Sequence, residues 1–133
     1  MWIPKLAMKF LNPKVKRDIK EGRPISLDLG SGTASRAGFY RVDIIELEGI
    51  DILADLNKPL DLLPDNCAEY VYSRHVLEHL KVFETLLREI RRITKPTGLI
   101  EITVPHFSNP FYYSDPTHVN FFGLYSILLH NWE

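Results

Sequence analysis

The sequence predicts an α/β protein built on a mainly parallel β-sheet, and three observations lead to this fold class. Short apolar runs bounded by Gly, Pro, Asp or Asn recur along the chain, which is typical of strands. A helical apolar stripe separates the last two runs, and a strand–helix–strand order favours parallel strands joined by a right-handed crossover. A glycine turn follows the first run, where α/β sheets bind ligands. The five expected strands cover residues 25–29, 40–45, 50–54, 70–73 and 99–104.

The helix between the fourth and fifth strands has the clearest pattern. Its apolar residues recur at helical spacing on one face. These residues are Leu80, Phe83, Leu86, Leu87, Ile90 and Ile93. Glu84 stands four residues before Arg88 on the other face, a spacing that supports a helix. Residues 95–98, Lys-Pro-Thr-Gly, are expected to end it.

The whole chain, residues 1–133, is expected to form one domain, because a core of this size can support a single fold. Residues 1–20 predict an N-terminal amphipathic helix that Pro13 interrupts and that packs on its own domain, with docking on a membrane or partner as the alternative. Residues 25–104 form the core. Residues 105–133 contain an aromatic loop and then a C-terminal helical pattern at 121–132.

Composition excludes several classes of protein. Hydrophobic residues make up 45% of the chain and charged residues 25%, as in average soluble proteins. A net charge of -1 gives no field that attracts nucleic acid, and no apolar run is long enough for a membrane span. The single cysteine, Cys67, cannot form an intramolecular disulfide. We therefore expect a cytoplasmic protein without nucleic-acid or membrane partners.

Three strand ends carry the residues that suggest a nucleotide-type site. The first strand runs into Gly30-Ser31-Gly32, where missing side chains let the backbone approach a ligand. Asp43 ends the second strand, where its carboxylate can accept both hydroxyls of a ribose. The alternative is a solvated strand-end aspartate. Asp55 ends the third strand at the same edge.

These motifs and their order resemble the class I S-adenosylmethionine-dependent methyltransferases, most closely the compact methyltransferase-11-like group. The resemblance covers roughly residues 26–123. Its motifs are DLGSG at 28–32, VDI at 42–44 and ADLNKPLDLLPDNCAEYVYSRHVLEHL at 54–80. It implies a Rossmann-like sheet of order 3-2-1-4-5 and an enzyme that transfers a methyl group from S-adenosylmethionine.

The resemblance also implies roles for particular residues. The glycine turn would bind the methionine part of the cofactor, Asp43 the ribose, and Asp55 would lie near the adenine. The full expected cofactor set is Asp28, Gly30, Ser31, Gly32, Asp43, Asp55, Leu56, Ser73, Arg74 and His75.

The acceptor is expected to be a small molecule or a glycan, bound against the aromatic loop at 106–118. His106, His118 and Asp115 are the candidates for taking a proton from the acceptor. Simple packing of this loop is the alternative for each residue. Because the cofactor already carries an activated methyl group, positioning supplies much of the catalysis.

The chain departs from the usual methyltransferase pattern in two places. Only seven residues separate Gly32 from Tyr40, so the helix between the first two strands is expected to shrink to a turn or disappear. The sequence to Glu133 contains no counterpart of the family's C-terminal antiparallel strands, as expected of either a minimal domain or a truncated product. The strand at 99–104 is then expected to have an unpaired edge. We expect that edge to form a homo-oligomer or to be covered by residues 121–132.

Two other enzyme classes and one non-enzyme class remain to be weighed. His75-Val76-Leu77-Glu78-His79 matches the His-x-x-Glu-His pattern of inverted zinc peptidases. That site needs a third ligand from a separate helix, where only His130 is available, so no metal is expected. A dehydrogenase is disfavoured because Ser35 stands where a third glycine would be needed. A catalytically silent cofactor-binding or scaffold protein of the same fold stays open.

Overall fold

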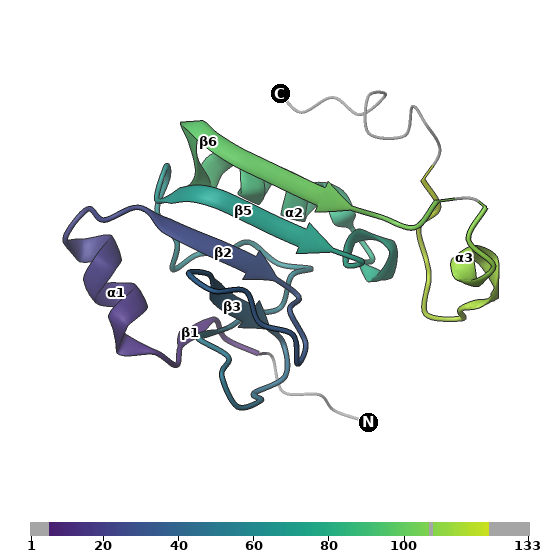
Figure 1. Cartoon of the computed structure of the whole chain (residues 1–133), viewed down its shortest axis with the longest axis horizontal. Helices are drawn as coiled ribbons and strands as arrows, with labels where there is room; N and C mark the ends of the chain where they lie inside the picture. The colour runs from purple at the N-terminus through teal and green to yellow at the C-terminus, as the bar shows by residue number, and fades with distance from the viewer. Residues whose placement is uncertain (1–5, 107, 123–133) are drawn as a thin grey trace.

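A computed structural model describes residues 6–106 and 108–122 of the chain. Within them a six-stranded sheet has the order β1-β4-β3-β2-β5-β6 (Figure 1). The strands are β1 (Lys9–Phe10), β2 (Ile25–Leu29), β3 (Tyr40–Asp43), β4 (Ile52–Leu53), β5 (Ala68–Arg74) and β6 (Thr94–Thr103). The helices are α1 (Pro13–Lys20), η1 (Leu77–His79, a 3-10 helix), α2 (Phe83–Ile93) and α3 (Phe111–Ser114).

Five of the six strands have the predicted order and direction. Strands β4, β3, β2, β5 and β6 are parallel neighbours, which is the order 3-2-1-4-5 expected for the five apolar runs. The sequence did not predict β1, which pairs antiparallel with β4 through Lys9 opposite Leu53. The mainly parallel α/β prediction is therefore confirmed, with one added edge strand.

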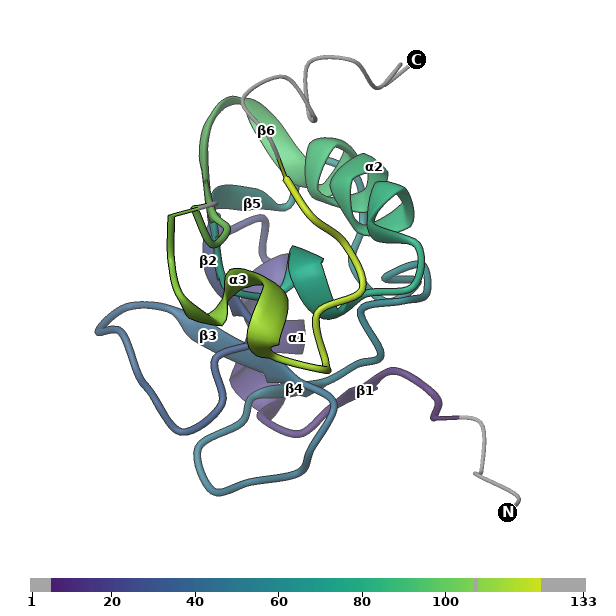
Figure 2. The ribbon, with the colours of Figure 1, turned by 90° about the vertical axis from the view of Figure 1, so that its right-hand side faces the viewer.

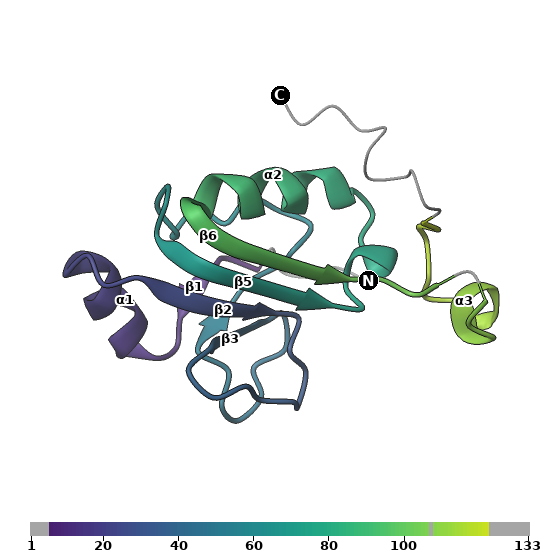
Figure 3. The same cartoon turned by 45° about the horizontal axis from the view of Figure 1, so that its top comes forward.

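Helix α2 covers one face of β5 and β6, and the predicted crossover is confirmed (Figure 3). Phe83, Leu86, Ile90 and Ile93 of this helix are buried against the strands, as their spacing predicted. The expected turn at 95–98 is a local irregularity inside β6. Its register shifts between the pairs Ala68–Thr94 and Tyr70–Leu99, so four residues of β6 lie opposite one residue of β5.

The prediction for the N-terminal segment was wrong in its boundaries. Pro13 begins helix α1 instead of interrupting a helix, and residues 9–10 before it are a strand. The Asn12 side chain accepts a hydrogen bond from the Lys14 amide at 3.0 Å, which caps the helix. Proline is well suited to the next position, because the amide it lacks has no partner in a first turn. Residues 1–5 lie outside the described part of the chain.

Two further departures from the usual fold lie in the connection from β2 to β3 and at the β6 edge of the sheet. No helix forms between β2 and β3, where residues 33–39 are turns and coil, as expected from the short spacing. β6 ends the sheet and has one described neighbour, with Leu99 52% and Ile100 42% exposed. The segment expected to cover this edge lies largely beyond residue 122 and so outside the described residues. Among the described residues, no helix is long and apolar enough to cross a membrane.

Candidate functional site

The carboxyl ends of the parallel strands open into a pocket of about 260 Å³. Figure 2 shows this end of the sheet facing the viewer, with α3 in front of it. Five residues of the expected cofactor set line the pocket. They are Gly30, Asp43, Asp55, Leu56 and His75. Val76, His79 and Leu80 form the opposite wall, so residues from β2, β3, β4 and the segment after β5 meet here.

Gly30 and Gly32 give the turn its shape. Both adopt positive φ angles, +69° and +58°, which side-chain-bearing residues rarely adopt. A Cβ at Gly30 would lie 2.4 Å from Val76 Cγ2, whereas a Cβ at Gly32 would meet no heavy atom within 4 Å. The close approach to Val76 makes glycine necessary at position 30 for space as well as for conformation.

Asp43 ends β3 as predicted, and its carboxylate is already bound by the backbone. Its Oδ2 accepts a hydrogen bond from the Gly32 amide at 2.8 Å, and its Oδ1 accepts from the Ile44 and Ile45 amides at 2.7 Å and 3.3 Å. A carboxylate has about four acceptor positions, so three amide bonds leave capacity for a ligand hydroxyl. Asp43 therefore joins the glycine turn to the end of the next strand.

Arg41 is a supporting residue that the sequence did not reveal. It is buried in β3, and its Nη2 donates a hydrogen bond to the Gly32 carbonyl at 2.5 Å. Its Nε donates to Ser31 Oγ at 3.3 Å, and its Nη1 donates to the Glu48 carbonyl at 3.4 Å. The guanidinium thus holds the glycine turn in place through Ser31 and Gly32. Its only sequence signal is an arginine inside an apolar strand.

Asp55 is held in a similar way. Its Oδ1 accepts a hydrogen bond from the Asn57 amide at 2.9 Å, and its Oδ2 lies 3.5 Å from Lys58 Nζ. The same residue also lines a neighbouring pocket of about 350 Å³. Leu6, Ala7 and Met8 form part of this neighbouring pocket, here called the N-terminal pocket, so the N-terminal segment lies close to the position expected for adenine.

The other five residues of the expected cofactor set do not line the pocket at the glycine turn. They are Asp28, Ser31, Gly32, Ser73 and Arg74. Ser31 and Gly32 instead bind Arg41 and Asp43. Ser73 is fully buried, and Asp28 is buried within β2. Burial raises the pKa of Asp28, although Arg36 and Arg41 act in the opposite direction.

A second pocket, of about 250 Å³, lies on the other side of His75 and His79. It is lined by these two histidines together with Glu78, Pro105, Asn109, Asp115 and His118. The structure therefore brings together Asp115 and His118, two of the three expected proton-accepting residues, with His118 Nε2 3.5 Å from Asp115 Oδ2. The third, His106, does not line this pocket and contacts Ser108, with 2.6 Å between Nδ1 and Oγ.

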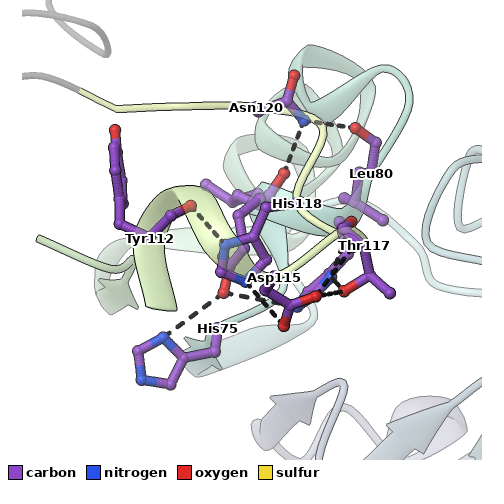
Figure 4. Close-up of polar contacts among 10 residues, drawn as sticks. His75, Leu80, Tyr112, Asp115, Thr117, His118 and Asn120 are labelled. Atoms are coloured by element: carbon purple, nitrogen blue, oxygen red, sulfur yellow. Dashed lines mark hydrogen bonds and ion pairs between the residues drawn. The ribbon is translucent and has the colours of Figure 1, made fainter. Parts of the chain in front are cut away.

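The segment around His118 is fixed onto helix η1 by hydrogen bonds to the backbone (Figure 4). Asn120 Nδ2 donates to the Leu77 carbonyl at 2.9 Å and to the Leu80 carbonyl at 2.5 Å. The Val119 and Asn120 amides both donate to the Glu78 carbonyl, at 2.7 Å and 3.1 Å. Residues some 40 positions apart in the sequence are in this way held against each other.

Asp115 is oriented within this segment by Thr117. Its Oδ1 accepts hydrogen bonds from both the amide and the hydroxyl of Thr117. These bonds lower the pKa of Asp115, and the nearby His118 and His79 act in the same direction. Asp115 therefore presents its second oxygen, Oδ2, to His118.

Comparison with known proteins gives one match along nearly the whole chain. A family model described as a methyltransferase domain matches residues 4–131. A crystal structure of an S-adenosylmethionine-dependent methyltransferase from Aquifex aeolicus is similar with a TM-score of 0.41 and 20% identity. That similarity covers 68% of this chain and 63% of the other, so the chain spans somewhat less than two thirds of that protein. No curated protein matches the sequence.

Proposed function

Because the chain belongs to the methyltransferase-domain family, we propose that it transfers a methyl group from S-adenosylmethionine to a small-molecule or glycan-type acceptor. The observation that carries this proposal is the convergence of Gly30, Asp43, Asp55 and Leu56 on one pocket at the carboxyl edge of a parallel sheet. This is the edge at which open α/β sheets bind nucleotides.

The residues of the pocket fit the proposed cofactor. Gly30 provides an approach without a side chain, and Asp43 retains acceptor capacity toward ribose hydroxyls after its three amide bonds. Leu56, Val76 and Leu80 supply apolar surface. The pocket is close to the lower limit of the roughly 300–1,000 Å³ that is usual for ligand sites. Asp55 also lines the N-terminal pocket beside Met8, so the two are adjacent.

When bound, S-adenosylmethionine supplies a methyl group on a positively charged sulfur. The residues of this chain then act by holding the two reactants in line, which alone supplies a large part of such a rate acceleration. His75 and His79 line both pockets. An acceptor in the second pocket would therefore lie next to the cofactor pocket, with these two side chains between them. Asp115 stands in the second pocket with its Oδ2 3.5 Å from His118 Nε2, and it can accept a proton from an acceptor.

Calorimetric titration with S-adenosylmethionine and S-adenosylhomocysteine tests this function, with NAD as the comparison ligand. Asp43→Ala should weaken binding of the first two by at least about tenfold, because a charge-assisted hydrogen bond is worth about 1.5–3 kcal/mol. Asp43→Asn should weaken it less, since the amide retains an acceptor. Glu46→Ala, an exposed change on the loop that follows, is the matched control and should bind like the parent.

Removing Asp43 should also cost stability, because the Gly32, Ile44 and Ile45 amides lose their acceptor. The expected loss is about 1–3 kcal/mol in the free energy of unfolding. Binding must therefore be measured at a temperature where parent and variant are both folded. Equal cofactor affinity in the folded parent and the folded Asp43→Ala protein would refute the proposed site.

A further inference from the structure

The second pocket contains a buried carboxylate that the proposed methyl transfer does not explain. Glu78 is 1% exposed, and neither of its side-chain oxygens has a hydrogen-bond partner within the described part of the chain. An ionised carboxylate in such a position costs several kcal/mol unless another charged group compensates it. Helix η1 nevertheless fixes this residue so that it lines the pocket.

Two histidines direct nitrogen atoms toward this carboxylate. His79 Nδ1 lies 3.2 Å from the Thr117 carbonyl, and His118 Nδ1 lies 3.0 Å from the Tyr112 carbonyl. His79 Nδ1 also lies 3.0 Å from the Thr117 hydroxyl, which donates its own proton to Asp115 Oδ1. Carbonyls only accept hydrogen bonds, so Nδ1 of each ring is assigned the proton and donates it. The Nε2 atoms are then left as the potential ligand atoms. A backbone carbonyl that binds the far nitrogen is the usual partner of a metal-binding histidine.

The spacing of the polar atoms suits a shared ion better than hydrogen bonds. Glu78 Oε1 lies 3.5 Å from His75 Nδ1 and 3.7 Å from His79 Nε2, which is too long for good hydrogen bonds. Around a zinc ion with bonds of about 2.0–2.1 Å, neighbouring tetrahedral ligands are about 3.4 Å apart. The ligand atoms of Glu78, His79 and His118 all lie within 4.8 Å of one another, so a bound ion would draw them closer together.

We propose that Glu78, His79 and His118 form a binding site for a divalent transition-metal ion, with Asp115 at its edge. Two imidazoles and a carboxylate favour ions of the zinc class over Mg²⁺ or Ca²⁺, which prefer oxygen ligands. A doubly charged ion would neutralise Glu78 and the nearby Asp115. Without the ion, His79 Nε2 and Glu78 Oε1 would lie 3.7 Å apart with no proton between them.

The proposed ion differs from the one that the His-x-x-Glu-His pattern suggested. That pattern requires His75 and His79 one helical turn apart, but His75 has a φ of +55° and lies before η1. The third proposed ligand is His118, from the segment after α3. No metal was expected from the sequence because His130 was the only third ligand considered there, and His130 lies outside the described residues.

The position of the site indicates what the ion would do, and this part rests on the proposed function. Three protein ligands leave a coordination position for a further oxygen, as in catalytic zinc sites. An acceptor hydroxyl bound there would be a stronger acid than in water. The pocket at the glycine turn is adjacent, since His75 and His79 line both. The expected acceptor therefore carries an oxygen that can bind the ion.

Zinc binding to the full chain, measured by competition with a chromogenic chelator, tests the site. We expect one zinc ion per chain in the parent protein. Glu78→Gln and His118→Ala should each weaken it by at least about a hundredfold, since loss of an outer-shell partner alone costs about 10–100-fold. The matched controls His106→Ala and Glu46→Gln should stay within about twofold of the parent. Zinc affinity that is absent from the parent, or unchanged in both ligand variants, would overturn the proposal.

Chemical modification of the parent protein gives a second test that needs no variant to fold. Zinc should protect His79 and His118 from acylation by diethyl pyrocarbonate, read by mass spectrometry, while His106 should remain reactive. Equal modification of all three with and without zinc would contradict the site. S-adenosylhomocysteine binding in the presence of a chelator is measured in parallel. Its loss would refute the proposed function and leave the zinc result intact, so the two failures are distinguishable.

Discussion

Asp43 and Asp55 in one pocket and Glu78 in the neighbouring one have their carboxylates held in opposite ways. In the pocket at the glycine turn, Asp43 and Asp55 accept hydrogen bonds from backbone amides before any ligand is present. In the second pocket, Glu78 is buried and its oxygens have no donor in the described chain. The first arrangement stabilises the protein by itself, whereas the second needs a cation to do so. A carboxylate therefore stabilises the fold on one side of His75 and indicates a bound cation on the other.

The largest effect that this comparison predicts concerns the backbone of the first pocket. Gly30→Ala would place a Cβ 2.4 Å from Val76 Cγ2 at a residue with a φ of +69°. Left-handed strain of about 1–2 kcal/mol and overpacking of about 1–3 kcal/mol together predict a loss of about 3 kcal/mol. Gly32→Ala is the matched control, because its Cβ meets open space, and it should lose only about 1 kcal/mol.

Denaturant unfolding of both glycine variants measures this difference. A loss at position 32 as large as the loss at position 30 would show that the turn strain dominates and that the contact with Val76 does not matter. A small loss at both positions would mean that the turn can relax. Only this second outcome would mean that the pocket at the glycine turn is less rigidly built than the hydrogen bonds of Asp43 and Arg41 suggest.

The second pocket should respond in the opposite direction. Glu78→Met replaces a buried carboxylate that lacks donors with an apolar side chain of similar size. In a chelator at pH 8, the free energy of unfolding should rise by about 1 kcal/mol, because replacing such a group is neutral or stabilising. Denaturant unfolding of the parent and the variant under the same conditions is the measurement. A loss of 2 kcal/mol or more would show that Glu78 already has a stabilising partner without metal.

The sequence predicted the elements whose own residues show a strand or helix pattern. The five parallel strands and helix α2 follow from apolar runs and helical spacing, which depend on neighbours in the chain. The N-terminal prediction failed on one local detail. Asn12 caps a helix that starts at Pro13, but the apolar residues before Pro13 outweighed this signal in the sequence.

The sequence predicted only those residues of the site that belong to a local motif. Strand-end positions identified Asp43 and Asp55, because an acid after a parallel strand lies at the binding edge. Arg41 was missed, since nothing in an apolar strand indicates that its guanidinium reaches back to the glycine turn. His118 was noted as a proton acceptor, but its position beside Glu78 depends on the hydrogen bonds of Asn120 to residues some 40 positions away. Contacts at that separation leave no local pattern.

The smallest predicted effect is an opposite response to acid of Asp28, in β2, and Asp115, in the second pocket. Asp28, buried beside the glycine turn, has a raised pKa because burial disfavours its charged form. Its ionised form is therefore unfavourable to folding at neutral pH, and this cost disappears as the pH falls through its folded pKa toward 3.8. Asp115 has a pKa lowered by the Thr117 hydrogen bonds, so its contribution is present above 3.8 and is lost as the pH falls through its folded pKa.

Asp28→Asn and Asp115→Asn separate these two contributions when unfolding is measured between pH 2 and pH 7. The stability of the parent relative to Asp28→Asn should rise on acidification from neutral pH. Its stability relative to Asp115→Asn should hold down to about pH 4 and then fall. The second change should be the smaller, because Asp115 is partly exposed and solvent screens its interactions. Profiles of the same sign for both residues would contradict the contrast between a buried acid in the sheet and an oriented acid on the loop.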